Sequence, residues 1–126
     1  MSKVKGGIGS GKRVFETGAT RDANDDKLNY RGFFHPLVQK RFAEYMHENR
    51  HLKDGTMRDA DNWWQLFGED HFTVCVESLS RHAEDLKLHH AGFSDEAVED
   101  LERSICGIIF NANAYLLKVL LEKRKK

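Results

Sequence analysis

The segment from Ile105 to Leu121 constrains the fold of this chain more than any other part of the sequence. It is apolar on nearly all sides of a helix, and helices of that kind are normally buried all round. The helix is expected to start at Ser94, because Ser-Asp-Glu-Ala resembles a capping residue followed by acids in the first turn. It is expected to continue to about Lys123, where basic residues suit the C-terminal dipole. We therefore expect this helix to be the central and most buried element.

Two further segments show the periodicity of amphipathic helices. The first starts after Pro36, whose fixed φ suits a first helical turn, and runs to about Arg50. The second runs from about Asp70 to His90 and stops at a glycine. Alternation of β-branched residues is nearly absent. These patterns predict an all-α protein, a helical bundle with no sheet beyond a short hairpin near residues 15 to 32.

The segment between these two helices, "NRHLKDGTMRDADNWWQLFGED", is too apolar to be a plain linker. Asp54-Gly55 marks a turn, and an aromatic cluster that includes Trp63, Trp64 and Phe67 follows it. A loop of this length with its own aromatic cluster is usually functional or packs as a lid. We expect the same here.

Length and charge limit the class of protein. The 126 residues are enough for one ordinary domain, and the formal net charge is +0 with a pI of about 7.1. A general nucleic-acid-binding domain usually has a strong basic excess, so no stable nucleic-acid complex is expected. Cys75 and Cys106 lie in apolar helical patterns and fit buried free thiols in a reducing compartment. Because we find no signal peptide and no apolar run of membrane-spanning length, we expect a cytoplasmic protein without a membrane partner.

The glycine-rich stretch "KGGIGSGKR" has the Gly6 to Gly11-Lys12 spacing of a phosphate-binding P-loop. In that motif a Ser or Thr hydroxyl after the lysine holds Mg²⁺, and here Arg13 stands in its place. No apolar strand precedes the glycines, and no amphipathic helix follows Lys12. We therefore interpret residues 1–14 as a flexible basic arm and residues 15–126 as a single helical domain.

Polar side chains beside the apolar stripes are candidates for chemistry. His82 and Asp85 lie three residues apart on one flank of the second helix, together with Arg81. A His and an Asp at this spacing can hold one metal ion, whereas the alternative is an exposed charged flank. On the last helix, Glu102 and Asn113 border the apolar stripe, and Asn111 lies on its other side. These side chains form the first candidate site.

The spacing of the acids is similar to that of the all-α nucleotide pyrophosphohydrolases of the MazG type. Those enzymes carry paired acids at i, i+3 on two successive helices, whose oxygens hold Mg²⁺. Here His82-x-x-Asp85 is followed by Glu102. The second acid of the later pair would stand three residues after Glu102, where this chain has Ile105. The opening "GIGSGKRVFETGATRDANDDKLNY" resembles that of a phage-encoded family of dATP/dGTP diphosphohydrolases, which are small MazG-like all-α enzymes. The likeness covers nearly the whole chain, through "PLVQKRFAEYMHENR", "DGTMRDADNWWQLFG", "ESLSRH", "HHAG" and "ICGIIFNANAYLL".

The resemblance implies a metal-dependent hydrolase of nucleotide metabolism that converts dGTP or dATP to the monophosphate and pyrophosphate. It implies a location in the cytoplasm of a phage-infected bacterial host. The catalytic residues that it implies are His82, Asp85 and Glu102. The ligands of Mg²⁺ or Mn²⁺ would come from Glu44, His82, Asp85 and Glu102. The residues that it places near the nucleotide substrate are Arg21, Lys27, Asn62, Trp63, Arg81 and Asn111.

Several of these residues have alternative interpretations. Glu44 could be a solvated charge, Trp63 could pack in the core or a lid, and Asn111 could tie its helix to the Asp61–Trp64 loop. Arg103 departs from the family pattern, which has an acid there, and this favours a non-catalytic nucleotide-binding or phage accessory protein. Two long helices and one short one leave apolar surface that a second chain could cover, so a homo-oligomer is expected.

Overall fold

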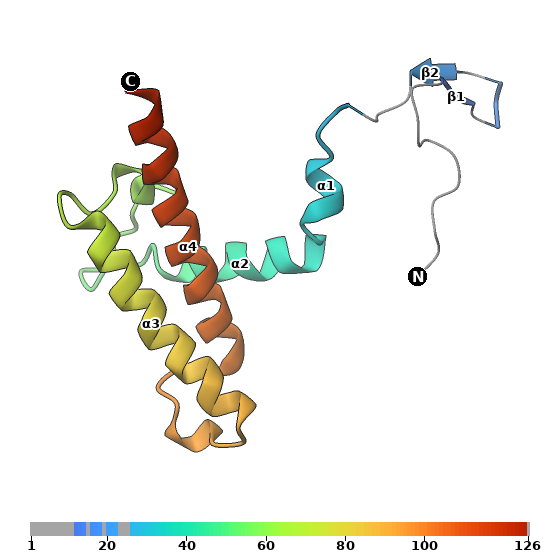
Figure 1. Cartoon of the computed structure of the whole chain (residues 1–126). Coiled ribbons are helices and arrows are strands. Elements are labelled where there is room, and N and C mark those ends of the chain that lie inside the picture. The colour runs from blue at the N-terminus through green and yellow to red at the C-terminus, as the bar shows by residue number, and fades with distance from the viewer. Residues whose placement is uncertain (1–11, 15, 19, 23–25, 126) are drawn as a thin grey trace. The chain divides into compact units, whose positions relative to one another are not determined.

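Two antiparallel helices pack along each other at the centre of the larger part of the chain (Figure 1). They are α3, His71–His90, and α4, Leu101–Arg124. The structure is a computed structural model that describes residues 12–14, 16–18, 20–22 and 26–125. The chain divides into two units, Met1–Pro36 and Leu37–Lys126.

The first unit contains a short hairpin and a short helix. β1, Lys12–Val14, pairs antiparallel with β2, Thr20–Asp22, and Gly18 between them has a φ of +85° that favours glycine. α1, Tyr30–Phe33, follows Asn29, whose side-chain oxygen accepts a hydrogen bond from the N–H of Gly32 at 2.7 Å. The hairpin lies close to the predicted range but starts earlier. Residues 1–11, which form most of the expected arm and hold both glycines of the P-loop spacing, lie outside the described residues.

The helices of the second unit agree largely with the periodicity of the sequence. α2, Pro36–Glu48, and α3 both begin and end within about two residues of their predicted limits. α2 runs across α4 (Figure 1), and the Nε of Arg41 on α2 contacts the Oε1 of Glu102 on α4 at 2.6 Å. The prediction of a mainly α-helical protein is therefore confirmed.

The predicted start of the last helix at Ser94 is wrong, because α4 begins at Leu101. Ser94–Glu96 forms a separate turn of 3₁₀ helix (η2), and Ala97 after it is extended, with φ −78° and ψ 146°. The cap of α4 is instead Asp100, whose side chain accepts a hydrogen bond from the N–H of Arg103 at 2.8 Å. The chain between the two helices is thus free to fold back onto α3.

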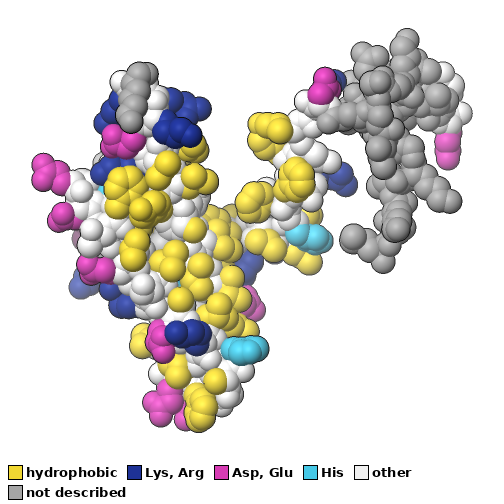
Figure 2. Space-filling view, in the orientation of Figure 1, with side chains coloured by type: hydrophobic (Ala, Val, Ile, Leu, Met, Phe, Trp, Pro, Cys, Tyr) yellow, Lys and Arg dark blue, Asp and Glu magenta, His cyan; other side chains and the backbone are white. Residues whose placement is uncertain are grey.

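α4 is less buried than its sequence predicts. Its buried positions are mostly small or polar, and they are Ser104, Cys106, Gly107, Asn111 and Ala114. Large side chains remain exposed, and Leu116 keeps 54% of its surface. Figure 2 shows hydrophobic side chains gathered over this helix. The expectation of a helix buried on all sides is therefore wrong for α4 in the single chain.

α4 also contains the apolar run that the sequence analysis did not find. A window of 18 residues has a mean hydropathy of 1.6, which by length and composition is enough to cross a membrane. The core helix of a soluble protein passes the same test, but only 28% of this window is buried. The window therefore has apolar surface that the other described residues leave uncovered.

The two cysteines lie in the core, Cys75 on α3 and Cys106 on α4. Cys75 and Cys106 are free thiols that are almost fully buried, as the sequence predicts. Burial raises the pKa of both thiols, so they stay protonated at neutral pH. Both cysteines therefore act as small hydrophobic residues of the core.

Candidate functional site

The second unit contains a cavity of about 470 Å³, bordered by α2, the loop after it, α3 and α4. Its size lies within the range of small-molecule sites, about 300–1,000 Å³. Four of the residues that the sequence analysis assigned to catalysis or nucleotide binding line this cavity. They are Asn62, Trp63, His82 and Asn111. Residues far apart in the sequence thus converge on one place.

The loop between α2 and α3 that contains Trp63, Trp64 and Phe67, called the aromatic loop below, forms one wall of the cavity. Trp63 lies in a short 3₁₀ helix, Asn62–Gln65 (η1), and its ring meets that of Phe110 on α4 edge-to-face at 5.9 Å. Phe67 contacts the same ring at 6.4 Å. The prediction that this segment packs as more than a linker is confirmed. Trp63 both packs against α4 and lines the cavity.

A buried histidine fixes the end of this loop. His71 is fully buried, and its Nδ1 accepts a hydrogen bond from the backbone N–H of Phe67 at 3.1 Å. Its Nε2 donates to the carbonyl oxygen of Ala114 on α4 at 2.8 Å. Since one ring nitrogen accepts and the other donates, the imidazole is neutral in this arrangement. His71 thereby attaches the aromatic wall to α4.

A turn carries two arginines into the cavity lining. His51 and Met57 form an isolated antiparallel bridge around Asp54-Gly55. Arg50 donates from Nε to the carbonyl oxygen of Arg58 at 2.7 Å, and Arg58 donates from Nη1 to that of Asn49 at 3.1 Å. Both arginines line the cavity.

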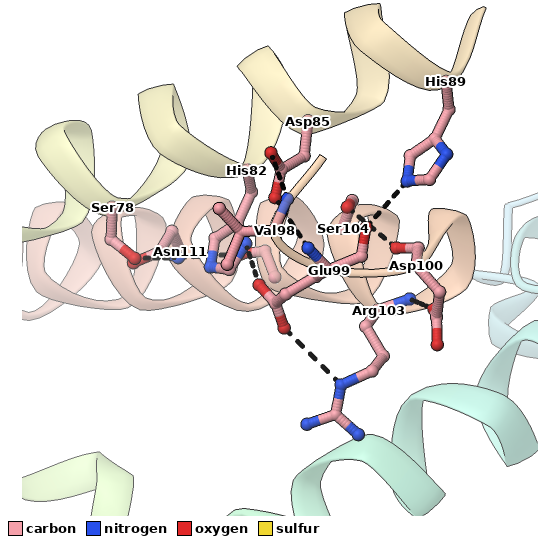
Figure 3. A network of polar contacts seen from close by, with 11 residues as sticks. Ser78, His82, Asp85, His89, Val98, Glu99, Asp100, Arg103, Ser104 and Asn111 are labelled. Carbon is pink, nitrogen blue, oxygen red and sulfur yellow. Dashed lines mark hydrogen bonds and ion pairs between the residues drawn. The ribbon is translucent and has the colours of Figure 1, made fainter. Parts of the chain in front are cut away.

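His82 belongs to a polar network that joins three helices (Figure 3). Its Nδ1 lies 2.9 Å from the Oε1 of Glu99, while the other oxygen of Glu99 lies 3.5 Å from the Nε of Arg103. Arg103 also pairs with Glu48 on α2, and its guanidinium lies 5.9 Å from the ring centre of Tyr45. Hydrogen bonding to Glu48 raises the pKa of Arg103 further, so this residue is a permanent cation between two carboxylates.

Asp85 holds the returning chain in place. Its Oδ1 accepts a hydrogen bond from the N–H of Val98 and its Oδ2 one from the N–H of Glu99, both at 3.1 Å (Figure 3). The residue is buried and does not line the cavity. Hydrogen bonds of this kind to an ionised group are among the stronger ones in proteins. In this structure Asp85 orders the segment that presents Glu99 to His82.

Asn111 ties α4 to α3 rather than to the aromatic loop. Its Nδ2 donates to the Oγ of Ser78 at 3.1 Å and to the carbonyl oxygen of Gly107 at 2.7 Å. The alternative interpretation of a structural tie to Asp61–Trp64 is therefore wrong in its partner. Gly107 itself allows close contact, because a Cβ there would lie 2.5 Å from the ring of His82.

The remaining predicted residues lie elsewhere. Glu102 pairs with Arg41 and keeps 71% of its side-chain surface exposed, while Glu44 forms a surface pair with Lys40 at 3.8 Å. Arg81 is exposed and does not line the cavity. Arg21 and Lys27 belong to the first unit, Arg21 in β2 and Lys27 in the exposed segment before α1.

The predicted metal ligands do not gather at one point. Among the residues that the structure describes, no three His, Cys, Asp or Glu side chains form a group that could hold a metal ion. Glu44, His82, Asp85 and Glu102 each have a different partner, namely Lys40, Glu99, the backbone of the 98–99 segment and Arg41. This set of residues therefore does not fit a shared Mg²⁺ or Mn²⁺ ion in the arrangement observed.

Arg50, Arg58, Glu99, Gly107 and Phe110 belong to the site but were not assigned to it from the sequence. The two arginines flank a recognised Asp-Gly turn, so their spacing across it was a usable signal. Glu99 was placed inside a helix that in fact begins later.

No protein-family model, curated protein or solved structure matches this chain.

Proposed function

We propose that the chain is a nucleotide pyrophosphohydrolase that binds a purine deoxynucleoside triphosphate in this cavity. The reaction would give the monophosphate and pyrophosphate. The observation that carries the proposal is the convergence of Asn62, Trp63, His82 and Asn111 on one cavity of suitable size. An aromatic wall that includes Trp63 and Phe110 offers a surface for a purine base.

In the proposed reaction His82 acts as the general base. Glu99 accepts the hydrogen bond of its Nδ1–H, which leaves the Nε2 lone pair to receive a proton. Water attacks phosphorus at the α–β phosphoanhydride, the bridging P–O bond breaks, and pyrophosphate leaves while the water proton passes to Nε2. The resemblance implies that the reaction requires Mg²⁺ or Mn²⁺. Because the implied ligands are not gathered, no step of the reaction is assigned to the ion.

The pair formed by Arg103 with Glu48 and Glu99 favours a second candidate function. A fixed cation already neutralises these two carboxylates, and the resemblance implies an acid at this position instead. A protein of this kind would bind the nucleotide without hydrolysing it, or act as a phage accessory protein.

Release of pyrophosphate from dGTP and dATP, measured with Mg²⁺ and with Mn²⁺, tests the proposal. We expect turnover by the wild type and a loss of about 10²–10⁴-fold in His82→Ala, the scale of removing a general base. His90→Ala is the matched control, because His90 is exposed on the same helix. Binding without pyrophosphate release would support the second function. Absence of both binding and release would contradict the proposal.

We further propose that the chain forms a homo-oligomer through an apolar groove between α3 and α4. The groove has a volume of about 420 Å³ and is lined by Cys75, Val76, Leu79, Asn111, Ala112, Tyr115, Leu116 and Val119. The buried share of the apolar window of α4, only 28%, supports this proposal. A second copy supplies an equally apolar helical face, and a two-fold interface pairs the same patch on both chains.

Leu116→Lys is expected to convert the oligomer to a monomer. The substitution places a charge on a half-exposed position of the groove, where burial against a second copy would desolvate it. Sedimentation velocity should give a multiple of 14.6 kDa for the wild type and about 14.6 kDa for the variant. Val98→Lys, at a position that is 91% exposed and outside the groove, should leave the mass unchanged. A wild type that is monomeric, or soluble only in detergent, would contradict this proposal.

A further inference from the structure

The cavity has two cations that the sequence analysis did not assign to the ligand. Arg50 and Arg58 lie on the two arms of the turn around Asp54-Gly55, and both line the cavity. Hydrogen bonds from Thr56 lower the pKa of Asp54, so this turn keeps its ionised, hydrogen-bonded form at neutral pH. The arginines are thus carried by a well-defined local structure.

Each of the two guanidinium groups is held by the backbone rather than by an acid. Arg50 uses Nε on one carbonyl oxygen, and Arg58 uses Nη1 on another. Within residues 26–125 neither makes an ion pair, although Asp59 also lines the cavity. Their other N–H groups make no hydrogen bond within the same range. These arginines are held in position with donors left for an anion.

Arg41 and Arg103 give the contrast within the same unit. Both are paired with carboxylates, Arg41 with Glu102 and Arg103 with Glu48 and Glu99. Their charge is therefore already neutralised by the protein. The charge of Arg50 and Arg58 is not, and it lies at a cavity whose lining also includes Trp63, Phe67 and Phe110.

A ligand that matches both features has a flat ring system and several negative charges. We infer that Arg50 and Arg58 bind the phosphate chain of the nucleotide while its base lies against the aromatic wall. This inference rests on the proposed function and deepens it. It assigns to the turn the phosphate contacts that the resemblance places at Arg21, Lys27 and Arg81.

Titration of tryptophan fluorescence with dGTP, dGMP and deoxyguanosine tests the inference. The titrations are done without metal, so that binding is measured without hydrolysis. Arg50→Gln and Arg58→Gln should each weaken dGTP binding by about 10- to 100-fold, the range for losing hydrogen bonds to a charged group. Deoxyguanosine should bind as before. Arg124→Gln is the matched control, because Arg124 is exposed, lies outside the cavity lining and also donates to a backbone carbonyl oxygen, and it should leave both affinities unchanged.

The possible failures are distinguishable. If wild type and both variants bind dGTP equally, the arginine assignment is wrong while the nucleotide pocket stands. If the wild type binds none of the three compounds, the pocket itself is wrong. Should the glutamine variants lose their helical circular dichroism, wild-type titrations at several salt concentrations decide. Affinity for dGTP must then fall with salt more steeply than affinity for deoxyguanosine, and equal slopes would overturn the inference.

Discussion

His71→Ala is expected to lower the free energy of unfolding by about 3–6 kcal/mol. The substitution leaves two backbone groups, the partly buried N–H of Phe67 and the buried carbonyl of Ala114, without their partner. Each unsatisfied group costs about 1–3 kcal/mol, and the cavity left by a fully buried ring adds to this. Urea denaturation followed by circular dichroism measures the effect.

His90→Ala is the control for this measurement, since His90 lies at the exposed end of the same helix. It should change the free energy of unfolding by less than about 1 kcal/mol, the scale of a charge near a helix end. Equal effects of the two substitutions would show that the contacts of His71 do not attach the aromatic loop to α4. His71→Ala should also weaken nucleotide binding, because Phe67 and Trp63 then lose the attachment of their loop to α4.

The parts of the fold that follow from local pattern could be predicted. Pro36 and the apolar periodicity after it define α2, and the stripe through Cys75 defines α3. The start of α4 could not be predicted in the same way. The residues that follow Ser94 satisfy the local signal for a helix start, but Asp85 binds the backbone of Val98 and Glu99 and holds that segment outside the helix. Asp85 lies 13 and 14 positions before these two residues, and a capping pattern shows nothing of contacts over such separations.

The candidate site shows the same division. Trp63 and Asn111 were recognisable as polar or aromatic residues in unusual places, and both line the cavity. Asp85 and Glu102 were grouped because acids on neighbouring helices can share an ion. Their actual partners are a backbone segment and Arg41, and the periodicity of a single helix does not show which elements meet it. The type of a side chain was therefore enough to predict some of the residues that line the cavity. Which acids remain available to a ligand there depends on tertiary contacts.

Gly107 is the position where a single methyl group is expected to disturb the proposed site most directly. A Cβ there would lie 2.5–2.6 Å from three ring atoms of His82, and that ring is held by Glu99. Gly107→Ala should therefore lower the free energy of unfolding by about 1–3 kcal/mol, as overpacking does. Because the ring must move, pyrophosphate release should fall by about 10²-fold, the scale of a misplaced catalytic group.

The same substitution in a His82→Ala background provides the decisive comparison. Without the imidazole, alanine at position 107 meets no ring and should stabilise α4 by about 1 kcal/mol, because glycine is the poorer helix former. The four proteins form a double-mutant cycle whose coupling free energy should be about 2–4 kcal/mol. Urea denaturation of all four measures it. An equal cost of Gly107→Ala in both backgrounds would contradict the close packing of His82 on α4, and with it the geometry on which the proposed general base depends.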